Sequence, residues 1–451
     1  MKLILDSKII FFPLSFFICL ILYYPTFHSE PIWDDYHFIF FNEVISGDGL
    51  ILGTILSKFN WALSVLAQKT LYSFFYENYF LYHCTNFLLH YVNGLLFFYF
   101  LKINKIKTPH WGFLIFLLHP SMIISVSWII QFKTLLCGFF ALLSLIALNL
   151  STYFIRNKRR VLRGFSFISF LLSLSSKSAS IPLYVANYLI NNRIKLSKFL
   201  LVPLVIISSF VCYKLVSSPI TQEGIHRAVT STSTPFTTLE FILLAIPQTL
   251  NWYFWQSLIP MESIPVRGAL PVLYAQTIVG LFTMIIFFIL VWKNKKAIRF
   301  FVASFIMLLP FLGIIPAPYM SSAWVSEQHL YLVLIFFIPA VALLIESIPK
   351  FKVRTSVQIL SLIFVGTVSF LSIDNYKDEH QFFRSSFDFN NNLPAGYHLL
   401  NHYVANKQIE EAKTHFFHLI TTIPMEERKN SNIFWAQIMQ LEPTLNTKQS
   451  E

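Results

Sequence analysis

Long uninterrupted apolar runs constrain this chain more than any other feature of its sequence. Runs of roughly 16–22 residues recur along most of the 451 residues, and each is long enough as a helix to cross about 30 Å of hydrocarbon. Only 12% of the residues are charged, whereas about 25% is usual in a soluble protein. A membrane β-barrel would show short alternating segments instead. The sequence therefore predicts an all-α polytopic membrane protein.

The positive charge follows the apolar pattern. The net charge is +12, but the basic residues gather in short links between apolar runs, where they set membrane topology rather than bind nucleic acid. We therefore predict no nucleic-acid partner. The links lie at 102–107, 156–163, 193–198, 293–299 and 350–354. The four cysteines fall inside apolar runs without paired spacing, which indicates neither a disulfide framework nor zinc.

Topology follows if all five basic links are cytoplasmic, because neighbouring links must then be separated by an even number of crossings. About eleven transmembrane helices meet this condition, and they place the N-terminus inside and the C-terminus outside. They are expected at 9–26, 80–101, 111–130, 133–153, 162–176, 179–191, 199–216, 272–292, 300–317, 329–346 and 355–373. A further apolar segment, 241–259, would break the parity, so we expect it to be re-entrant or to lie in the membrane interface.

The sequence divides into two parts. Residues 1–373 form the membrane domain, with a first outer loop at 27–79, and residues 374–451 are polar with a helical pattern. Five positions in this tail keep the spacing of one 34-residue tetratricopeptide repeat; they are Leu399, Tyr403, Ala412, Phe416 and Pro424. We predict a small C-terminal helical domain outside the membrane, with an ordinary helical hairpin as the alternative.

Asp34 and Asp35 are the leading catalytic candidates. They follow the first apolar run directly, between Trp33 and Tyr36, whose ring types favour the membrane interface. A carboxylate in an outer loop can take the proton from an attacking hydroxyl, or hold a divalent cation through oxygen. The alternative is an acidic helix start. A divalent cation at this pair stays open, and no other cofactor is indicated.

A row of polar residues interrupts the apolar segment near residue 90. His83, Asn86, His90 and Asn93 share one helical face, and polar groups at this depth must face protein or water. Hydrogen bonds between helices are expected for the last three. His83 lies nearest the outer end, where it can reach a substrate.

Three more charged residues lie at outer positions. Lys133 and Lys177 are lone cations where the positive-inside bias disfavours them, so either could bind a departing lipid phosphate or reach head groups. Glu327 opens a late apolar run; an acid/base role, a metal ligand and a helix N-terminal acid all fit it.

Short motifs occur in a fixed order along most of the chain. They are Trp33-Asp34-Asp35, Tyr82-His83 with Asn86, Leu89-His90 and Asn93, Leu118-His119-Pro120, Val126-Ser127-Trp128-Ile129 with Lys133, Leu174-Ser175-Ser176-Lys177, and Glu327 with Leu330-Tyr331-Leu332. This order resembles the polytopic membrane glycosyltransferases of the GT-C class, nearest to the membrane and tetratricopeptide O-mannosyltransferase-like family, which uses donors of the dolichyl-phosphate-mannose type.

The resemblance implies transfer of a sugar from a polyprenyl- or dolichyl-phosphate donor to a hydroxyl on the outer face. Asp34 or Asp35 would then be the base, and Lys133, Lys177 or His83 would meet the phosphate. The acceptor could be a protein, a lipid or a polysaccharide. The bias toward Phe, Asn, Lys and Ser suggests a bacterial inner membrane, with a periplasmic C-terminus.

Several charged positions of the family pattern differ. Ile124 stands where an acid is expected, Ser178 follows Lys177 in place of another acid, and Gln328 replaces an arginine beside Glu327. The competing hypothesis is therefore a non-catalytic membrane protein: a lipid or polysaccharide transporter, or a scaffold that has lost the activity of its relatives.

Overall fold

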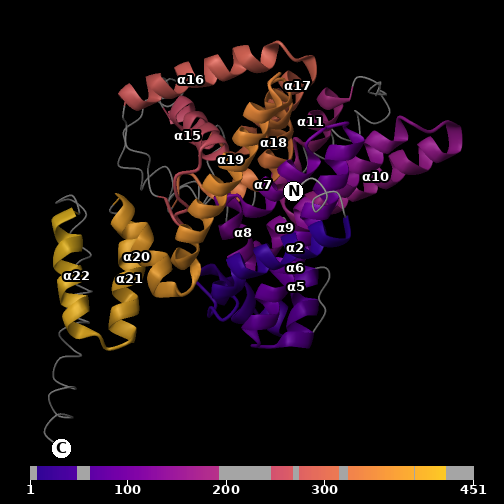
Figure 1. Cartoon of the computed structure of the whole chain (residues 1–451). Helices are drawn as coiled ribbons and strands as arrows, with labels where there is room; N and C mark the ends of the chain where they lie inside the picture. Colours follow the sequence, from indigo (N-terminus) through magenta and orange to yellow (C-terminus); the bar gives the residue numbers. More distant parts are fainter. Residues whose placement is uncertain are drawn as a thin grey trace, which may run out of the picture.

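The fold is known from a computed structural model, which describes residues 8–47, 61–191, 245–267, 274–313, 323–390 and 392–422. Within these ranges all regular elements are helices, and a single isolated backbone bridge joins Arg267 to Val325. The expected all-α class is confirmed for this part of the chain (Figure 1). The crossing expected at 199–216 and Pro424 of the repeat pattern lie outside the described residues.

The helices fall into a large body and a C-terminal unit. Those of the body are α2 (Lys8–Tyr23), α3 (Glu43–Ser46), α5 (Ala62–Phe75), α6 (Tyr79–Ile103), α7 (Pro109–Leu118), α8 (Ile123–Ser127), α9 (Phe132–Ser151), α10 (Arg156–Ser176), α11 (Leu183–Ile190), α15 (Ile246–Leu258), α16 (Tyr274–Trp292), α17 (Lys295–Leu308), α18 (Leu330–Glu346) and α19 (Phe351–Ser372). The C-terminal unit contains α20 (Glu379–Asn390), α21 (Leu393–Ala405) and α22 (Ile409–Thr422).

Four stretches are long and apolar enough to cross a membrane: Tyr79–Ile103, Ile129–Ser151, Glu327–Glu346 and Phe351–Tyr376. A fifth is counted if Pro109–Leu118 and Pro120–Ser127, which are bent by 55°, form one broken span. Apolar side chains also lie open on the surface; Leu360 of α19 and Phe282 of α16 are 64% and 63% exposed. These features are those of a multi-pass membrane protein.

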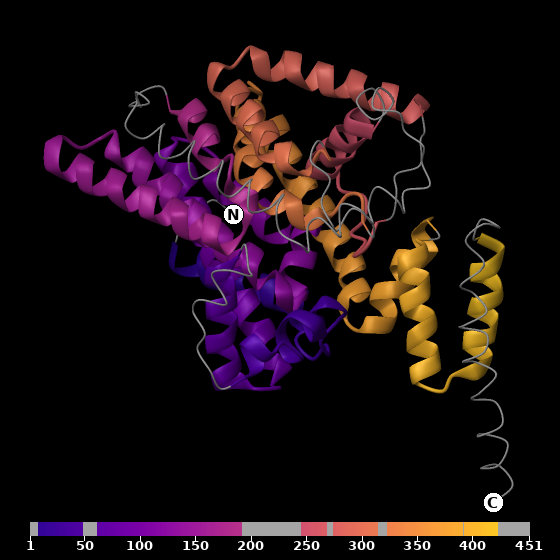
Figure 2. The same cartoon turned by 180° about the vertical axis from the view of Figure 1, so that it is seen from behind.

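The described residues thus support four or five candidate spans, and the expected eleven are not confirmed. Helix α11 has 8 residues, which at about 1.5 Å each cover some 12 Å. Helix α15, in the segment expected to avoid crossing, has 13 residues and covers about 20 Å. Helix α16 lies crosswise over the ends of α17 and α18 in both ribbon views (Figures 1 and 2).

The helix pair α9 and α10 shows how small polar residues join helices here. Ser144 Oγ donates to the carbonyl of Ser166, Ser166 Oγ donates to the carbonyl of Ser144, and both distances are 2.8 Å. Further along, Ser173 Oγ donates to the Cys137 carbonyl at 2.9 Å. Small hydroxyl residues let membrane helices approach closely. These bonds hold α9 and α10 side by side, so the start of α9 lies next to the end of α10.

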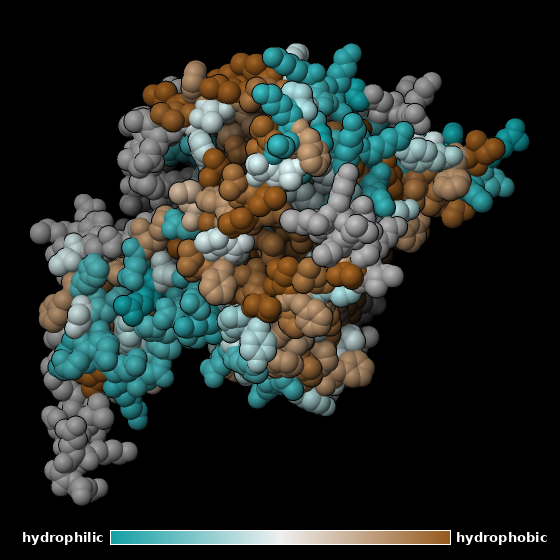
Figure 3. Space-filling model, viewed as in Figure 1, coloured by the Kyte–Doolittle hydropathy of each residue, from teal (hydrophilic) through white to brown (hydrophobic). Residues whose placement is uncertain are grey.

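The C-terminal unit is a helical hairpin preceded by a third helix. Leu399, Ala412 and Phe416, three of the repeat positions, are all buried. Gly396 is needed because a Cβ there would lie 2.7 Å from Leu419 Cδ1 and 2.8 Å from Phe387 Cδ2. Gly396 therefore makes room for the large side chain of Leu419 on the facing helix. In the space-filling view this unit is mainly hydrophilic, while the body carries broad hydrophobic areas (Figure 3).

The two ends of the body carry different features. At one end the basic links meet: Glu346 Oε1 accepts the backbone N–H of Lys107 at 2.6 Å, and Lys296 donates to the Asn104 carbonyl. At the other end the first loop reaches the C-terminal unit, where Ser29 Oγ donates to the Lys377 carbonyl at 2.7 Å. Which end faces the cytoplasm stays a prediction.

Candidate functional site

The carboxylate of Asp35 joins two segments of the backbone by hydrogen bonds. One carboxylate oxygen accepts the Ile32 N–H at 3.0 Å and the other accepts the Ile130 N–H at 2.7 Å. Trp33, at a positive φ of 47°, stacks on Trp128 with ring centroids 6.0 Å apart. Burial raises the pKa of Asp35 to about 8, against the lowering effect of the two N–H donors. With both oxygens used, Asp35 fastens the first loop to the turn before α9.

Asp34 differs from Asp35 in its exposure. Its side chain is half-buried rather than fully buried. Burial raises its pKa, and the opposing positive influences on it are Lys133 first and His37 second. Asp34 therefore lies within electrostatic range of Lys133, and of the two acids it is the more accessible to a substrate hydroxyl.

Lys133 and Lys177 come together although 44 residues separate them in the sequence, since each lies at the adjoining end of α9 or α10. Lys177 Nζ donates to Thr134 Oγ1 at 2.7 Å, and Thr134 Oγ1 donates to Gln131 Oε1 at 2.6 Å. Burial, with the Lys133 charge as second cause, lowers the pKa of Lys177 to about 7. Both lysines remain partly exposed.

The lysine cluster, by which we mean Asp34, Lys133 and Lys177, is electrostatically unbalanced. Among the described residues neither lysine forms a direct ion pair with a carboxylate, and Lys133 Nζ instead lies 4.8 Å from the ring centroid of Trp61. Lys133 lies within electrostatic range of Asp34, Asp35 and Lys177, whereas the charged neighbour of Lys177 is a second lysine rather than a carboxylate, so the lysine pair can attract an additional anion. His329, in the turn Glu327–His329, lies within electrostatic range of both lysines. Its ring stacks on that of Phe311 with the centroids 3.9 Å apart.

Glu327 belongs to a different cluster. It is fully buried, and its oxygens accept hydrogen bonds from Ser263 Oγ, from Gln256 Nε2 at 3.2 Å and from the Ile264 N–H at 3.2 Å. Arg267 Nη2 lies 3.4 Å from Glu327 Oε1. The structure thus brings Glu327 to the segment after α15, and not to Lys133 and Lys177. We refer to Glu327, Arg267, Ser263 and Gln256 as the glutamate network.

His83 also stays apart from the lysine cluster. Its Nε2 lies 3.1 Å from the Ser29 carbonyl, so it ties α6 to the first loop. The three polar residues further along α6 form the expected bonds between helices. Asn86 donates to the Val126 carbonyl at 3.2 Å, His90 Nδ1 lies 3.0 Å from Tyr331 Oη, and Asn93 donates to the same Oη at 2.9 Å.

A metal site does not form in the part of the chain that the structure describes. There, no group of three or more His, Cys, Asp or Glu side chains is arranged to hold a metal ion. Asp35 has both oxygens engaged by peptide N–H groups, which leaves Asp34 as the one acid of the pair able to offer an unbonded oxygen. The residues present therefore fit a single carboxylate acting as a base better than a shared divalent cation.

Some of these partners were missed by the sequence reasoning. Arg267 was not considered, because an isolated arginine in a segment without periodicity gives no sign of the acid it will meet. Thr134 and Gln131 were likewise overlooked beside Lys133, although a hydroxyl and an amide within one helical turn of a lone cation are a usable signal. Gln328 stands beside Glu327 in the sequence, and Arg267 is the arginine that contacts Glu327 in the structure.

Comparison with known proteins identifies no relative: no family model, curated protein or solved structure matches the chain. The function is therefore inferred from the chemistry of the lysine cluster and from the candidate membrane-spanning helices.

Proposed function

We propose that the protein is an integral membrane glycosyltransferase, which moves a sugar from a polyprenyl- or dolichyl-phosphate donor to a hydroxyl acceptor. The observation that carries the proposal is the lysine cluster, in which Lys133 lies within electrostatic range of the half-buried Asp34 and of Lys177, and the three residues come from three separate segments. The reaction needs a base for the acceptor and positive charge for the departing phosphate. The cluster supplies both.

The proposed step balances as a direct displacement. The acceptor hydroxyl gives its proton to the Asp34 carboxylate while its oxygen forms a bond to the anomeric carbon of the sugar. The bond between that carbon and the phosphate oxygen breaks, and the electron pair leaves with the lipid phosphate. The ammonium groups of Lys133 and Lys177 stabilise the charge that builds on the phosphate. Attack opposite the leaving group inverts the anomeric centre.

The test separates the two neighbouring acids. Membranes containing the protein are incubated with radiolabelled polyprenyl-phosphate sugars and candidate acceptors, and transferred label is measured. Asp34→Asn should lower transfer by about 10²–10⁴-fold without loss of folded protein, since a general base contributes about that much. Asp35→Asn should instead lower the free energy of unfolding by about 1–3 kcal/mol, because one peptide N–H loses its acceptor.

The control is Glu410→Gln, an exposed acid of α22 that lies away from the cluster. It should change neither transfer nor stability. If Asp34→Asn leaves transfer intact in folded protein, the proposed mechanism is wrong.

A non-catalytic carrier of lipid phosphates is a second candidate, because a broken helix is a feature of transporters. The 55° bend between Pro109–Leu118 and Pro120–Ser127 is the observation that favours it. In a carrier, Lys177→Met should reduce lipid-phosphate movement across proteoliposomes, whereas Asp34→Asn should not. A transferase gives the reverse for Asp34, with label in the acceptor.

A further inference from the structure

A polar cavity of about 500 Å³ lies where the first loop meets the C-terminal unit. Its size falls in the range of about 300–1,000 Å³ that is common for small-molecule sites. The first loop provides one wall, and the start of α20 with residues near α21 provides the other. The lining residues are His28, Glu30, Pro31, Tyr36, Lys377, Asp378, Glu379, His380, His402 and Gln408.

The walls of this cavity are held in place by contacts between the two parts. Ser29 Oγ donates to the carbonyls of Lys377 and Tyr376, at 2.7 and 3.3 Å. Trp33 packs against His398 and Phe383, with ring centroids 5.3 and 5.9 Å apart. The cavity is therefore a fixed part of the junction, and a ligand need not order it on binding.

Its position relates it to the candidate base. Pro31 and Tyr36 line the cavity, and they bracket Asp34 on the same short segment of the first loop. A molecule bound there lies beside the loop that carries Asp34. This is where an acceptor belongs, because the donor phosphate is assigned to the lysines at the ends of α9 and α10.

The residues that line the cavity restrict the class of ligand that can bind there. It offers three carboxylates, three imidazoles, a phenol and an amide, against a single ammonium from Lys377. Glu379 Oε2 lies 3.6 Å from His402 Nδ1, and His380 Nε2 lies 3.1 Å from Tyr403 Oη. Such a surface accepts many hydrogen bonds from hydroxyl groups, and it repels anions. An aromatic ring among the polar groups adds an apolar face for a sugar ring.

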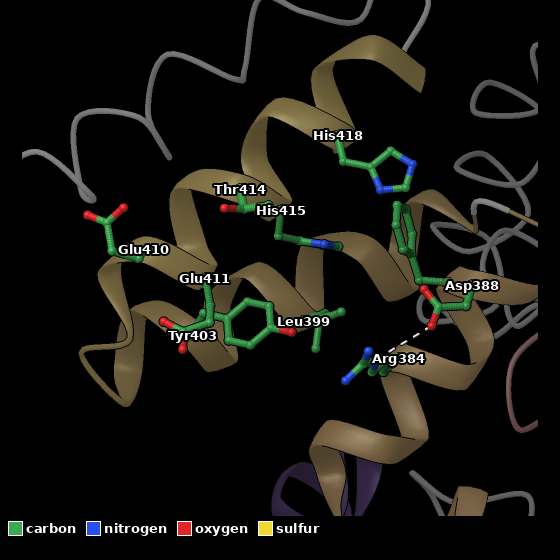
Figure 4. A pocket seen from close by; sticks show the side chains of 10 residues that line it. Arg384, Asp388, Leu399, Tyr403, Glu410, Glu411, Thr414, His415 and His418 are labelled. Atoms are coloured by element: carbon green, nitrogen blue, oxygen red, sulfur yellow. Dashed lines mark ion pairs between the residues drawn. The ribbon is translucent and has the colours of Figure 1, made fainter.

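A second polar pocket, of about 490 Å³, differs from this cavity in the segments that line it (Figure 4). It is lined only by α20, α21 and α22, and the paired side chains Arg384 and Asp388 lie along it. None of its lining residues comes from the first loop. It serves here as a source of control variants.

We propose that the cavity at the junction is the acceptor site and that it selects a neutral carbohydrate. This proposal depends on the glycosyltransferase function proposed above, which it makes more specific. Glu30 and Glu379 accept hydroxyl hydrogen bonds from opposite walls, Tyr36 packs against the sugar ring, and the carboxylates exclude acidic sugars.

The experiment measures binding without any donor. Full-length protein in detergent micelles is titrated with fluorescently labelled neutral trisaccharides of glucose, mannose and galactose, with a labelled oligouronate and with a labelled Ser/Thr-rich peptide. At least one neutral trisaccharide should bind, and the oligouronate should not. The double variant Glu30→Gln/Glu379→Gln should weaken that binding at least tenfold, while Glu410→Gln in the second pocket should leave it unchanged.

Several outcomes overturn the proposal. These are no binding of any neutral trisaccharide, equal binding of the oligouronate, affinity unaffected by the double variant, or binding of the peptide alone, which would indicate a polypeptide acceptor. If the double variant does not fold, Gln408→Ala, an exposed change in the same lining, replaces it and should weaken binding at least threefold.

The outcome also separates the two proposals. Lys177→Met should lower donor-dependent transfer by about 10²–10³-fold and leave trisaccharide binding intact. Binding without any transfer by the wild-type protein would refute the glycosyltransferase and leave a carbohydrate site. Transfer to a peptide with no trisaccharide binding would support the enzyme and refute the acceptor assigned here.

Discussion

The lysine cluster and the glutamate network are both charged groups in the interior of a membrane protein, but they are built differently. In the network, a fully buried acid receives three hydrogen bonds and an arginine. In the cluster, Asp34, Lys133 and Lys177 are all half-buried, Lys133 lies within electrostatic range of the other two, and neither lysine makes a direct ion pair within the described residues. Charges that are satisfied internally hold the fold, whereas charges left unbalanced are available to a ligand.

The largest expected effect concerns the glutamate network. Glu327→Ala takes away the buried acid of Arg267 and leaves it only Glu262, whose side chain is 41% exposed and lies 3.6 Å away, so the free energy of unfolding should fall by about 3–5 kcal/mol. Urea unfolding of detergent-solubilised protein, followed by tryptophan fluorescence, measures the change. A stable Glu327→Ala protein that has lost only sugar transfer would break the comparison, because the network would then belong to the site.

The lysines should behave in the opposite way. Lys177→Met should lower the rate of transfer by about 10²–10³-fold, as removal of one charge-stabilising donor does in other active sites. Stability should not fall, because the change relieves repulsion between Lys177 and Lys133. Lys158→Met removes an exposed cation of a basic link and is the matched control. A loss of stability as large as that of Glu327→Ala would contradict the distinction.

The pH dependence of transfer sharpens the assignment of Asp34. Burial raises its pKa above the usual value of about 3.9, and the base must be deprotonated, so transfer should be lost as the pH falls through a midpoint above that value. Lys133 lowers this pKa, so Lys133→Met should move the midpoint to higher pH. The profile of kcat/KM in the two proteins is the measurement. An identical midpoint would show that another group titrates.

The smallest effect is expected outside the body. Arg384 and Asp388 form an exposed pair at 3.5 Å on α20, with 55% and 60% of their side chains accessible. Arg384→Ala should change the free energy of unfolding by no more than about 0.5 kcal/mol. The same unfolding experiment gives the baseline against which Glu327→Ala is judged. If Arg384→Ala lowers the free energy of unfolding by more than about 2 kcal/mol, burial does not distinguish the exposed ion pair from the glutamate network.

The sequence singled out six site residues, of which the structure places Asp34, Lys133 and Lys177 near one another and His83 and Glu327 elsewhere; a catalytic role for any of them stays a prediction. Asp34, Lys133 and Lys177 each stood out because a charge at an outer turn of an apolar chain has few neutral explanations. The glutamate network was not foreseen, since Glu327 and Arg267 meet only through the path of the chain after α15. The crossing count also exceeded the described spans, because hydropathy does not show that α16 turns crosswise or that α11 ends after 8 residues.

The paired serines of α9 and α10 have a consequence for the site at the end of those helices. Ser144 and Ser166 bond reciprocally, so the gap between the two backbones is as narrow as a pair of hydroxymethyl groups permits. Lys133 lies in the first turn of α9 and Lys177 caps the end of α10, so in the proposed transferase the spacing of these helices also limits the width of the phosphate head group between the two ammonium groups. In the proposed transferase, a bulkier residue at position 144 would push the two helices apart and change which lipid phosphate binds, without altering any residue that touches the lipid.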